Sequence, residues 1–162
     1  MRWIWIDRFV EFEPGSSAKA VKNVSLAEEH LHDHWEDFPI MPVSLMIEGM
    51  AQTAGILVGQ ARDFKEKVIL AKISRAEVGE TVVPGDQLTY HAEIQTITDR
   101  AASIHGTVLR NGQSIGTIEL MFSHIDQNLA GTRFPKENFV FTGQFLRLLA
   151  GFVDVPPEVQ AQ

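Results

Sequence analysis

The chain has 162 residues, of which 44% are hydrophobic and 22% charged, so its length suits one globular domain with a sizeable core. Its net charge of −7 argues against nucleic acid as a partner, because phosphate neutralisation needs clustered Lys and Arg. The absence of cysteine excludes disulfides, thiolate metal sites and cysteine nucleophiles.

The first part of the chain predicts a turn and a strand. The N-terminus, Met1 to Arg8, has too short an apolar stretch for a signal peptide, so we expect a cytoplasmic protein. A turn is predicted at 13–17 and a strand at Ala18–Leu26. Residues 28–42 are expected to be irregular.

A helix is predicted from Val43 to about Arg62, with Pro42 suited to its first turn because proline has no amide hydrogen to satisfy there. The helix has almost no polar side, which is typical of a buried helix. Charged residues from Arg62 to Lys67 interrupt the longest apolar stretch, so no membrane span is expected.

Four strands are predicted after the helix. Their ranges are Val68–Val78, Gln87–Ile97, Ala101–Arg110 and Gln113–Ile125. Asn111-Gly112 predicts a tight hairpin turn between the last two, and Pro84-Gly85-Asp86 predicts a turn between the first two. One buried helix followed by long antiparallel strands indicates an α+β layer.

The tail from Glu137 to Phe152 is rich in Phe and Leu and is predicted to form an additional helix. We expect this helix to pack on its own fold or on a second subunit, while a lid or an anchor for a membrane or partner is the alternative. The expected division is a domain at 1–130 and a C-terminal extension at 131–162.

One face of the predicted helix carries a stripe of Ser44, Glu48, Gln52, Gly55 and Gly59. A carboxylate inside an apolar helix is costly unless it is paired or protonated, and a protonated carboxyl suits a general acid. The glycines would leave room for a thin acyl chain with its reactive end at Glu48. Equally, Glu48 could be a buried carboxylate satisfied by core hydrogen bonds, and the glycines could merely allow close packing.

The segment from His34 to Pro42 ends where the helix begins. The free amides of a first helical turn favour negative charge. A base, amide donors and an acid around one slot fit proton abstraction next to a carbonyl.

At this point the sequence resembles the FabA/FabZ-type 3-hydroxyacyl-[acyl-carrier-protein] dehydratases, and in particular the FabZ-like branch. That family's pattern is His-Phe-Pro-Gly-x-Pro-x-Met-Pro-Gly, four residues, an acidic residue, and Gln four positions later. The chain matches it without a gap at His34, Pro39, Met41, Pro42, Glu48 and Gln52. Val82 to Leu88, Lys22-Asn23-Val24 and Asp7-Arg8 are also similar to the family.

The resemblance implies a hot-dog fold and water elimination from (3R)-3-hydroxyacyl thioesters in fatty-acid synthesis, without a cofactor or metal. His34 would remove the C2 proton, and Glu48 would protonate the leaving 3-hydroxyl. An amide at the helix start, near Pro42 and Val43, would bind the thioester oxygen. Gln52 would steer Glu48 or hold the water, and Gly55 would border the acyl chain.

The resemblance also implies an assembly, because His34 and Glu48 come from different subunits in the family. A homodimer or an assembly of dimers is therefore expected. A glutamate at position 48 matches the branch that dehydrates without isomerising. The substrate carrier would be acyl carrier protein, docked through Lys65, Lys67, Lys72 and Arg75, or else coenzyme A.

The chain departs from the family pattern in two places. Trp35-Glu36-Asp37 replaces Phe-Pro-Gly, and Val43 replaces the glycine after Met-Pro. Valine keeps the amide hydrogen, but its side chain crowds the thioester.

Three other interpretations stay open at this stage. His30, His32 and His34, with Glu29 and Asp33, could bind a metal if they shared a face of an extended segment. A hot-dog thioesterase would use the helix carboxylate to activate water. A non-catalytic acyl-binding or scaffold subunit would bind ligand without turnover. His91, His105 and His124 are expected to be structural or solvent-facing.

Overall fold

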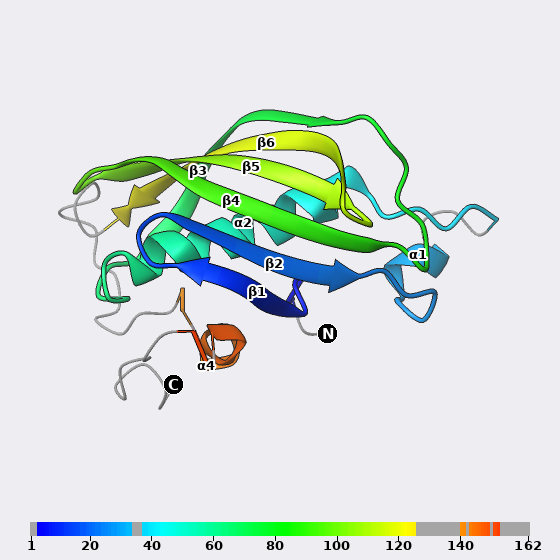
Figure 1. Ribbon diagram of the computed structural model, residues 1–162, viewed down its shortest axis with the longest axis horizontal. Coiled ribbons are helices and arrows are strands. Elements are labelled where there is room, and N and C mark those ends of the chain that lie inside the picture. Colours follow the sequence, from blue (N-terminus) through cyan, green and yellow to red (C-terminus); the bar gives the residue numbers. More distant parts are fainter. Residues whose placement is uncertain (1–2, 34–36, 126–139, 142, 150, 153–162) are drawn as a thin grey trace.

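The computed structural model describes residues 3–33, 37–125, 140–141, 143–149 and 151–152 (Figure 1). In this part of the chain, a six-stranded antiparallel sheet in the order β1-β2-β4-β5-β6-β3 wraps around the long helix α2 (Val43–Gln60). The strands are β1 (Arg8–Glu13), β2 (Ser17–Asn23), β3 (Val68–Val78), β4 (Gln87–Ile97), β5 (Ala101–Arg110) and β6 (Gln113–His124). The predicted α+β hot-dog architecture is confirmed.

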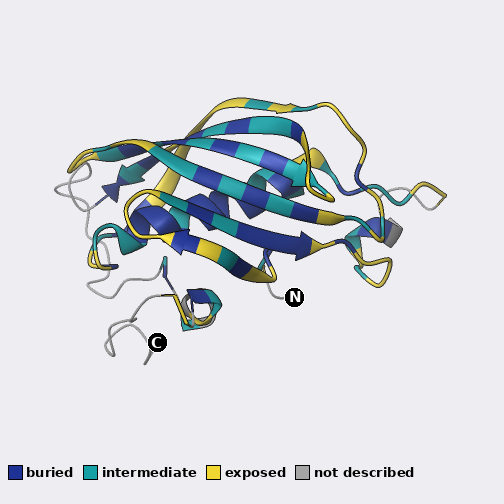
Figure 2. Cartoon of the chain, in the orientation of Figure 1, coloured by how far each residue is buried: buried dark blue, intermediate teal, exposed yellow. Residues whose placement is uncertain are grey.

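The sheet folds around the helix because its strands alternate between buried and solvent-facing side chains. In β5 every second residue is buried, namely Ala102, Ile104, Gly106 and Val108. This two-residue period places one face on the core, as the alternating colours of Figure 2 show. The helix fills that concave face, and its side chains from Met50 to Ala54 are buried.

The hairpin between β5 and β6 forms as predicted. Arg110 pairs with Gln113, so the loop consists of Asn111 and Gly112 alone. Both loop residues have positive φ, 50° and 87°, which is the requirement of a type I′ turn. The turn chemistry therefore fixes the register of the two strands.

The structure corrects several predicted limits. β2 ends at Asn23, β6 at His124 and α2 at Gln60. Pro42 is the N-cap of α2 rather than part of its first turn, because its ψ of 140° is extended while its carbonyl already accepts the amide of Leu45. The region predicted to be irregular contains a one-turn helix, α1 (His30–Asp33).

Strand β1 was missed by the sequence analysis. Its buried residues are Phe9 and Phe12, three positions apart, because the register shifts between Phe9 and Glu11. A bulge of this kind breaks the two-residue alternation by which strands are recognised.

The distance between helix and sheet is set by a glycine. A Cβ added at Gly49 would lie 2.5 Å from the ring of Tyr90, a fully buried residue of β4. The Tyr90 hydroxyl has no hydrogen-bond partner in the described part of the chain, and burial raises its pKa above the usual range, so it stays neutral. The tyrosine ring therefore occupies the space that a side chain at position 49 would need.

The predicted helix at 137–152 is much shorter in the described residues. There the chain forms one turn, α4 (Gly143–Leu146), followed by a 3-10 helix, η1 (Arg147–Leu149). Val140 and Phe141 are not helical. Gly151 has a φ of 91°, which an α-helix does not allow. Among the described residues, no helix is both long and apolar enough to cross a membrane.

Candidate active site

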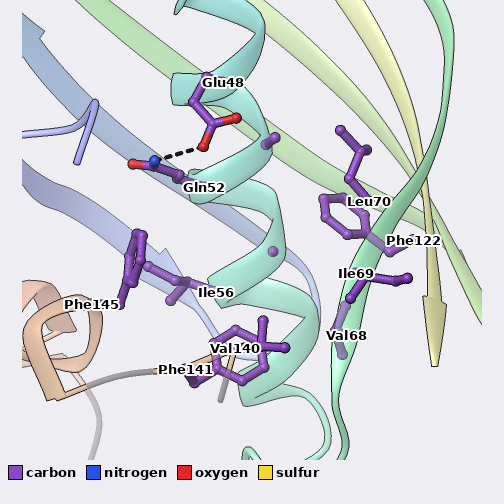
Figure 3. A pocket seen from close by; sticks show the side chains of 12 residues that line it. Glu48, Gln52, Ile56, Val68, Ile69, Leu70, Phe122, Val140, Phe141 and Phe145 are labelled. Atoms are coloured by element: carbon purple, nitrogen blue, oxygen red, sulfur yellow. Dashed lines mark hydrogen bonds between the residues drawn. The ribbon is translucent and has the colours of Figure 1, made fainter. Parts of the chain in front are cut away.

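A cavity of about 270 Å³ runs along α2 beside β3 (Figure 3). Among its lining residues only Glu48 and Gln52 carry polar side chains. The other residues of its wall are Ala51, Gly55, Ile56, Val68, Ile69, Leu70, Phe122, Val140, Phe141 and Phe145. Figure 3 shows Glu48 at one end and Phe141 with Val140 at the other. The cavity is thus an apolar slot with a carboxyl group at one end.

Glu48 is half-buried, and one of its two carboxylate oxygens is fully engaged. Its Oε1 accepts a hydrogen bond from Gln52 Nε2 at 2.8 Å and another from the Trp3 indole Nε1 at 3.1 Å. No hydrogen bond to Oε2 is found among the described residues, and that oxygen points away from Gln52 in Figure 3. The carboxyl group is therefore fixed by one oxygen while the other remains available to a ligand.

Gln52 is itself locked by the backbone of the N-terminal segment. Its Oε1 accepts the amide of Trp5 at 2.8 Å, and its Nε2 also donates to the carbonyl of Trp3 at 3.0 Å. A backbone amide can only donate and a carbonyl can only accept, so the side-chain amide cannot be flipped. The NH₂ group must face Glu48.

The structure brings only part of the predicted site together. Glu48, Gln52 and Gly55 line the same slot, whereas Pro42 and Val43 lie at the start of α2 and do not line it. The amides of Val43 and Ser44 have no hydrogen-bond partner among the described residues. His34 lies outside the described residues, so its position relative to Glu48 stays a prediction.

The glycine stripe has two different uses. Gly55 borders the slot, and a Cβ there would meet Phe122 at an ordinary 3.4 Å. Gly59 does not open space for a ligand, because its missing side chain is replaced by Phe141, whose Cζ would lie 2.3 Å from an added Cβ. The prediction that both glycines leave room for an acyl chain is therefore wrong for Gly59.

Two features of the site are not evident from the sequence alone. Trp3 was not connected with Glu48, and the cluster of aromatic residues at Trp3 and Trp5 was the only signal that this segment packs on the helix. Val140, Phe141 and Phe145 were recognised as apolar residues of the tail, but no sequence pattern indicated that they reach the same cavity.

The histidine cluster can be placed only in part, because His34 and the side chain of His32 lie outside the described residues. His30 lies in the one-turn helix α1 and not in the extended segment that the metal hypothesis requires. Burial lowers the pKa of His30, although Glu28 beside it acts in the opposite direction. No group of three or more potential metal ligands occurs among the described residues. Of the histidines in strands, His124 is fully buried and bonded to Glu66.

Comparisons with known proteins agree on the family. Residues 3–119 match the model of the FabA-like domain family. The 3-hydroxyacyl-[acyl-carrier-protein] dehydratase FabZ of Listeria monocytogenes serotype 4b is 34% identical over 125 residues, which are 76% of this chain and 87% of that protein.

Solved structures with this fold differ in activity. The dehydratase heterocomplex ApeI:P of Xenorhabdus doucetiae is similar with a TM-score of 0.64 and 15% identity, over 79% of this chain and 90% of that one. A thioesterase of Haemophilus influenzae is similar with a TM-score of 0.57 and 10% identity, over 70% and 74%. At these identities the likeness shows the fold alone. On the sequence match over most of its length, this chain belongs to the FabA-like family and, within it, is of the FabZ type.

Proposed function

We propose that the protein eliminates water from (3R)-3-hydroxyacyl thioesters to give trans-2-enoyl thioesters in fatty-acid synthesis. The observation that carries this proposal is the apolar slot with the Glu48 carboxyl at one end, held through one oxygen only. A fatty acyl chain fits an apolar slot, and its reactive carbons would then lie at the carboxyl group.

The proposed reaction needs one base and one acid. His34 removes a proton from C2, and Glu48 donates a proton to the 3-hydroxyl, which leaves as water as the C2–C3 double bond forms. Because Oε1 of Glu48 already accepts two N–H groups, the proton it donates is carried on Oε2. Gln52 and Trp3 are positioning residues that hold this orientation.

The start of α2 supplies a candidate for stabilising the thioester. The developing negative charge on the thioester oxygen needs preorganised N–H donors. The amide of Val43 is the first of the helix and has no partner among the described residues. Val43 is exposed, so its side chain can lie clear of an oxygen bound at its amide.

The edge strand β3 supports the expected homodimer. Ten of its eleven residues are exposed or half-buried, and among them Ile69, Leu70 and Ile73 are apolar. A long apolar edge strand is usually covered by another chain. Ile69 and Leu70 also line the slot, so a second subunit at this edge would complete the cavity wall and could bring its own His34 to Glu48.

We expect Ile73→Lys to dissociate this dimer and to lower hydration of crotonyl thioester in parallel, because an added charge cannot be buried without a partner. Light scattering after size-exclusion chromatography measures the first effect. Val83→Lys, at a similarly exposed apolar residue away from β3, is the matched control. A dimer that persists in Ile73→Lys with full activity would contradict the placement of the interface.

For the carrier, acyl carrier protein is proposed, with coenzyme A as the alternative. Of the four basic residues suggested for docking, Lys67 is buried, and Lys72 and Arg75 lie on β3, where the second subunit is proposed to bind. Lys65 is exposed outside that strand and remains the candidate for docking. Lys65 pairs with Asp63 at the surface, and such a pair is weak enough to be exchanged for a partner's acidic group. A cytoplasmic location stays part of this proposal.

The function is tested with one panel of acyl thioesters on coenzyme A and on carrier protein. We expect reversible hydration of crotonyl thioester, seen as loss of enoyl absorbance, without release of free thiol. Thiol release without hydration would instead identify a thioesterase. Binding without either reaction would identify an acyl-binding subunit.

A further inference from the structure

The slot ends at residues that lie outside the region matched by the family. That match stops at residue 119, whereas Val140, Phe141 and Phe145 line the cavity. In Figure 3 these three side chains lie beside Ile56 on the part of α2 away from Glu48. A segment beyond the family match thus forms one end of the slot.

We propose that this end wall, defined as Val140, Phe141, Phe145 and Leu149, determines which acyl chain lengths the enzyme accepts. The proposal rests on the proposed function, because it takes the occupant of the slot to be an acyl chain with its thioester end at Glu48. The wall restricts that occupant to short and medium chains.

The position of the wall is fixed by packing. Phe141 is 3% exposed, its ring fills the space left by Gly59, and it packs edge-to-face on Phe64 at a centroid distance of 5.3 Å. Leu149, at the other end of the wall, is fully buried and belongs to the same hydrophobic core. The wall is therefore held by buried residues on both sides of Phe145. Moving it to admit a longer chain would disrupt the packing of the core.

The size of the slot agrees with such a limit. From Glu48 to Ile56 the helix advances by roughly 12 Å, at a rise of about 1.5 Å per residue. The part of the cavity formed by one subunit has a volume of about 270 Å³, just below the range of about 300–1,000 Å³ for small-molecule pockets. A chain reaching beyond Ile56 meets Phe141 and Val140.

The test compares kcat/KM for crotonyl, 2-octenoyl and 2-dodecenoyl thioesters in wall variants. Phe145→Ala, which removes the phenyl ring, and Val140→Ala, which removes two methyl groups, are expected to raise the dodecenoyl-to-crotonyl ratio by about tenfold or more, because one carbon more or less in an apolar pocket already changes discrimination by about tenfold. Val140→Trp is expected to lower the octenoyl-to-crotonyl ratio by a similar factor. Phe152→Ala, at an exposed residue of the same segment, is the matched control and should leave both ratios unchanged.

Crotonyl turnover separates this proposal from the proposed function. If crotonyl thioester is hydrated while the ratios in the wall variants match those of Phe152→Ala, the wall proposal is overturned and the function stands. If no thioester is turned over, the function fails, and the wall is judged from calorimetric binding of butyryl-, octanoyl- and dodecanoyl-coenzyme A. In that case the wall variants are expected to change the ratio of the affinities for dodecanoyl- and butyryl-coenzyme A. An unchanged ratio overturns the proposal.

Discussion

Replacing Glu48 by glutamine is expected to lower hydration of crotonyl thioester by about 10²–10⁴, the usual contribution of one positioned proton donor. Glutamine can still accept the hydrogen bonds of Gln52 and Trp3 through its own Oε1, but its NH₂ group is not acidic and cannot transfer a proton to the leaving hydroxyl. The loss should therefore appear in kcat, with an unchanged unfolding temperature. Stopped-flow enoyl absorbance and thermal unfolding measure the two quantities.

His34→Ala is expected to cause a loss of similar size, and the double variant should lose little more than either single one, because residues that act as a unit are not additive. Glu93→Gln, at a half-buried carboxylate on the outer face of β4, is the control and should keep full activity. Wild-type rates in Glu48→Gln would show that Glu48 is not the general acid.

The same two variants test whether each active site is shared between subunits. In a dimer formed from one His34→Ala chain and one Glu48→Gln chain, one of the two composite sites carries neither substitution. Random mixing is therefore expected to restore about a quarter of wild-type activity, as the symmetry of a two-fold dimer requires. No recovery in verified mixed dimers would place both residues in one subunit.

Gly49→Ala is expected to destabilise the fold by about 1–3 kcal/mol, the usual cost of overpacking a tight core. The added Cβ would lie 2.5 Å from two ring carbons of Tyr90, which is completely buried and cannot move aside. The helix propensity of alanine offsets part of this cost, by at most about 1 kcal/mol. Thermal unfolding at one fixed protein concentration measures the net effect, since the proposed dimerisation would make the midpoint depend on concentration.

Gly55→Ala is the matched control, because it lies in the interior of the same helix and gains the same propensity. Its Cβ would meet only Phe122, at 3.4 Å, so we expect unchanged or slightly higher stability. Equal shifts in the two variants would mean that crowding at Tyr90 does not limit position 49.

Most of the fold could be predicted from local sequence patterns. The limits of β3, β4 and β5 and the start of α2 are as predicted, because alternation, apolar periodicity and turn residues act within a few positions of one another. The positive φ values of Asn111 and Gly112 follow from those two residues alone. Glu48, Gln52 and Gly55 were likewise placed together by helical spacing.

The limit of local patterns is seen in β1. The register shift after Phe9 hides the alternation of this strand, so only its pairing with β2 identifies it. In the tail the error is the opposite one, because a helix was predicted where most of the described residues are not α-helical. Apolar content alone did not reveal that Val140 and Phe141 adopt a non-helical conformation and pack on the core.

What the sequence determined by itself, then, is the buried helix with the four strands that follow it and the chemistry carried by the helix stripe. Tertiary structure alone decided that Trp3 orients Glu48, that Phe141 fills the space above Gly59, and that the tail closes the slot. The physical reason is that these contacts join residues more than 40 positions apart, and which surfaces meet at such separations depends on how the whole core packs.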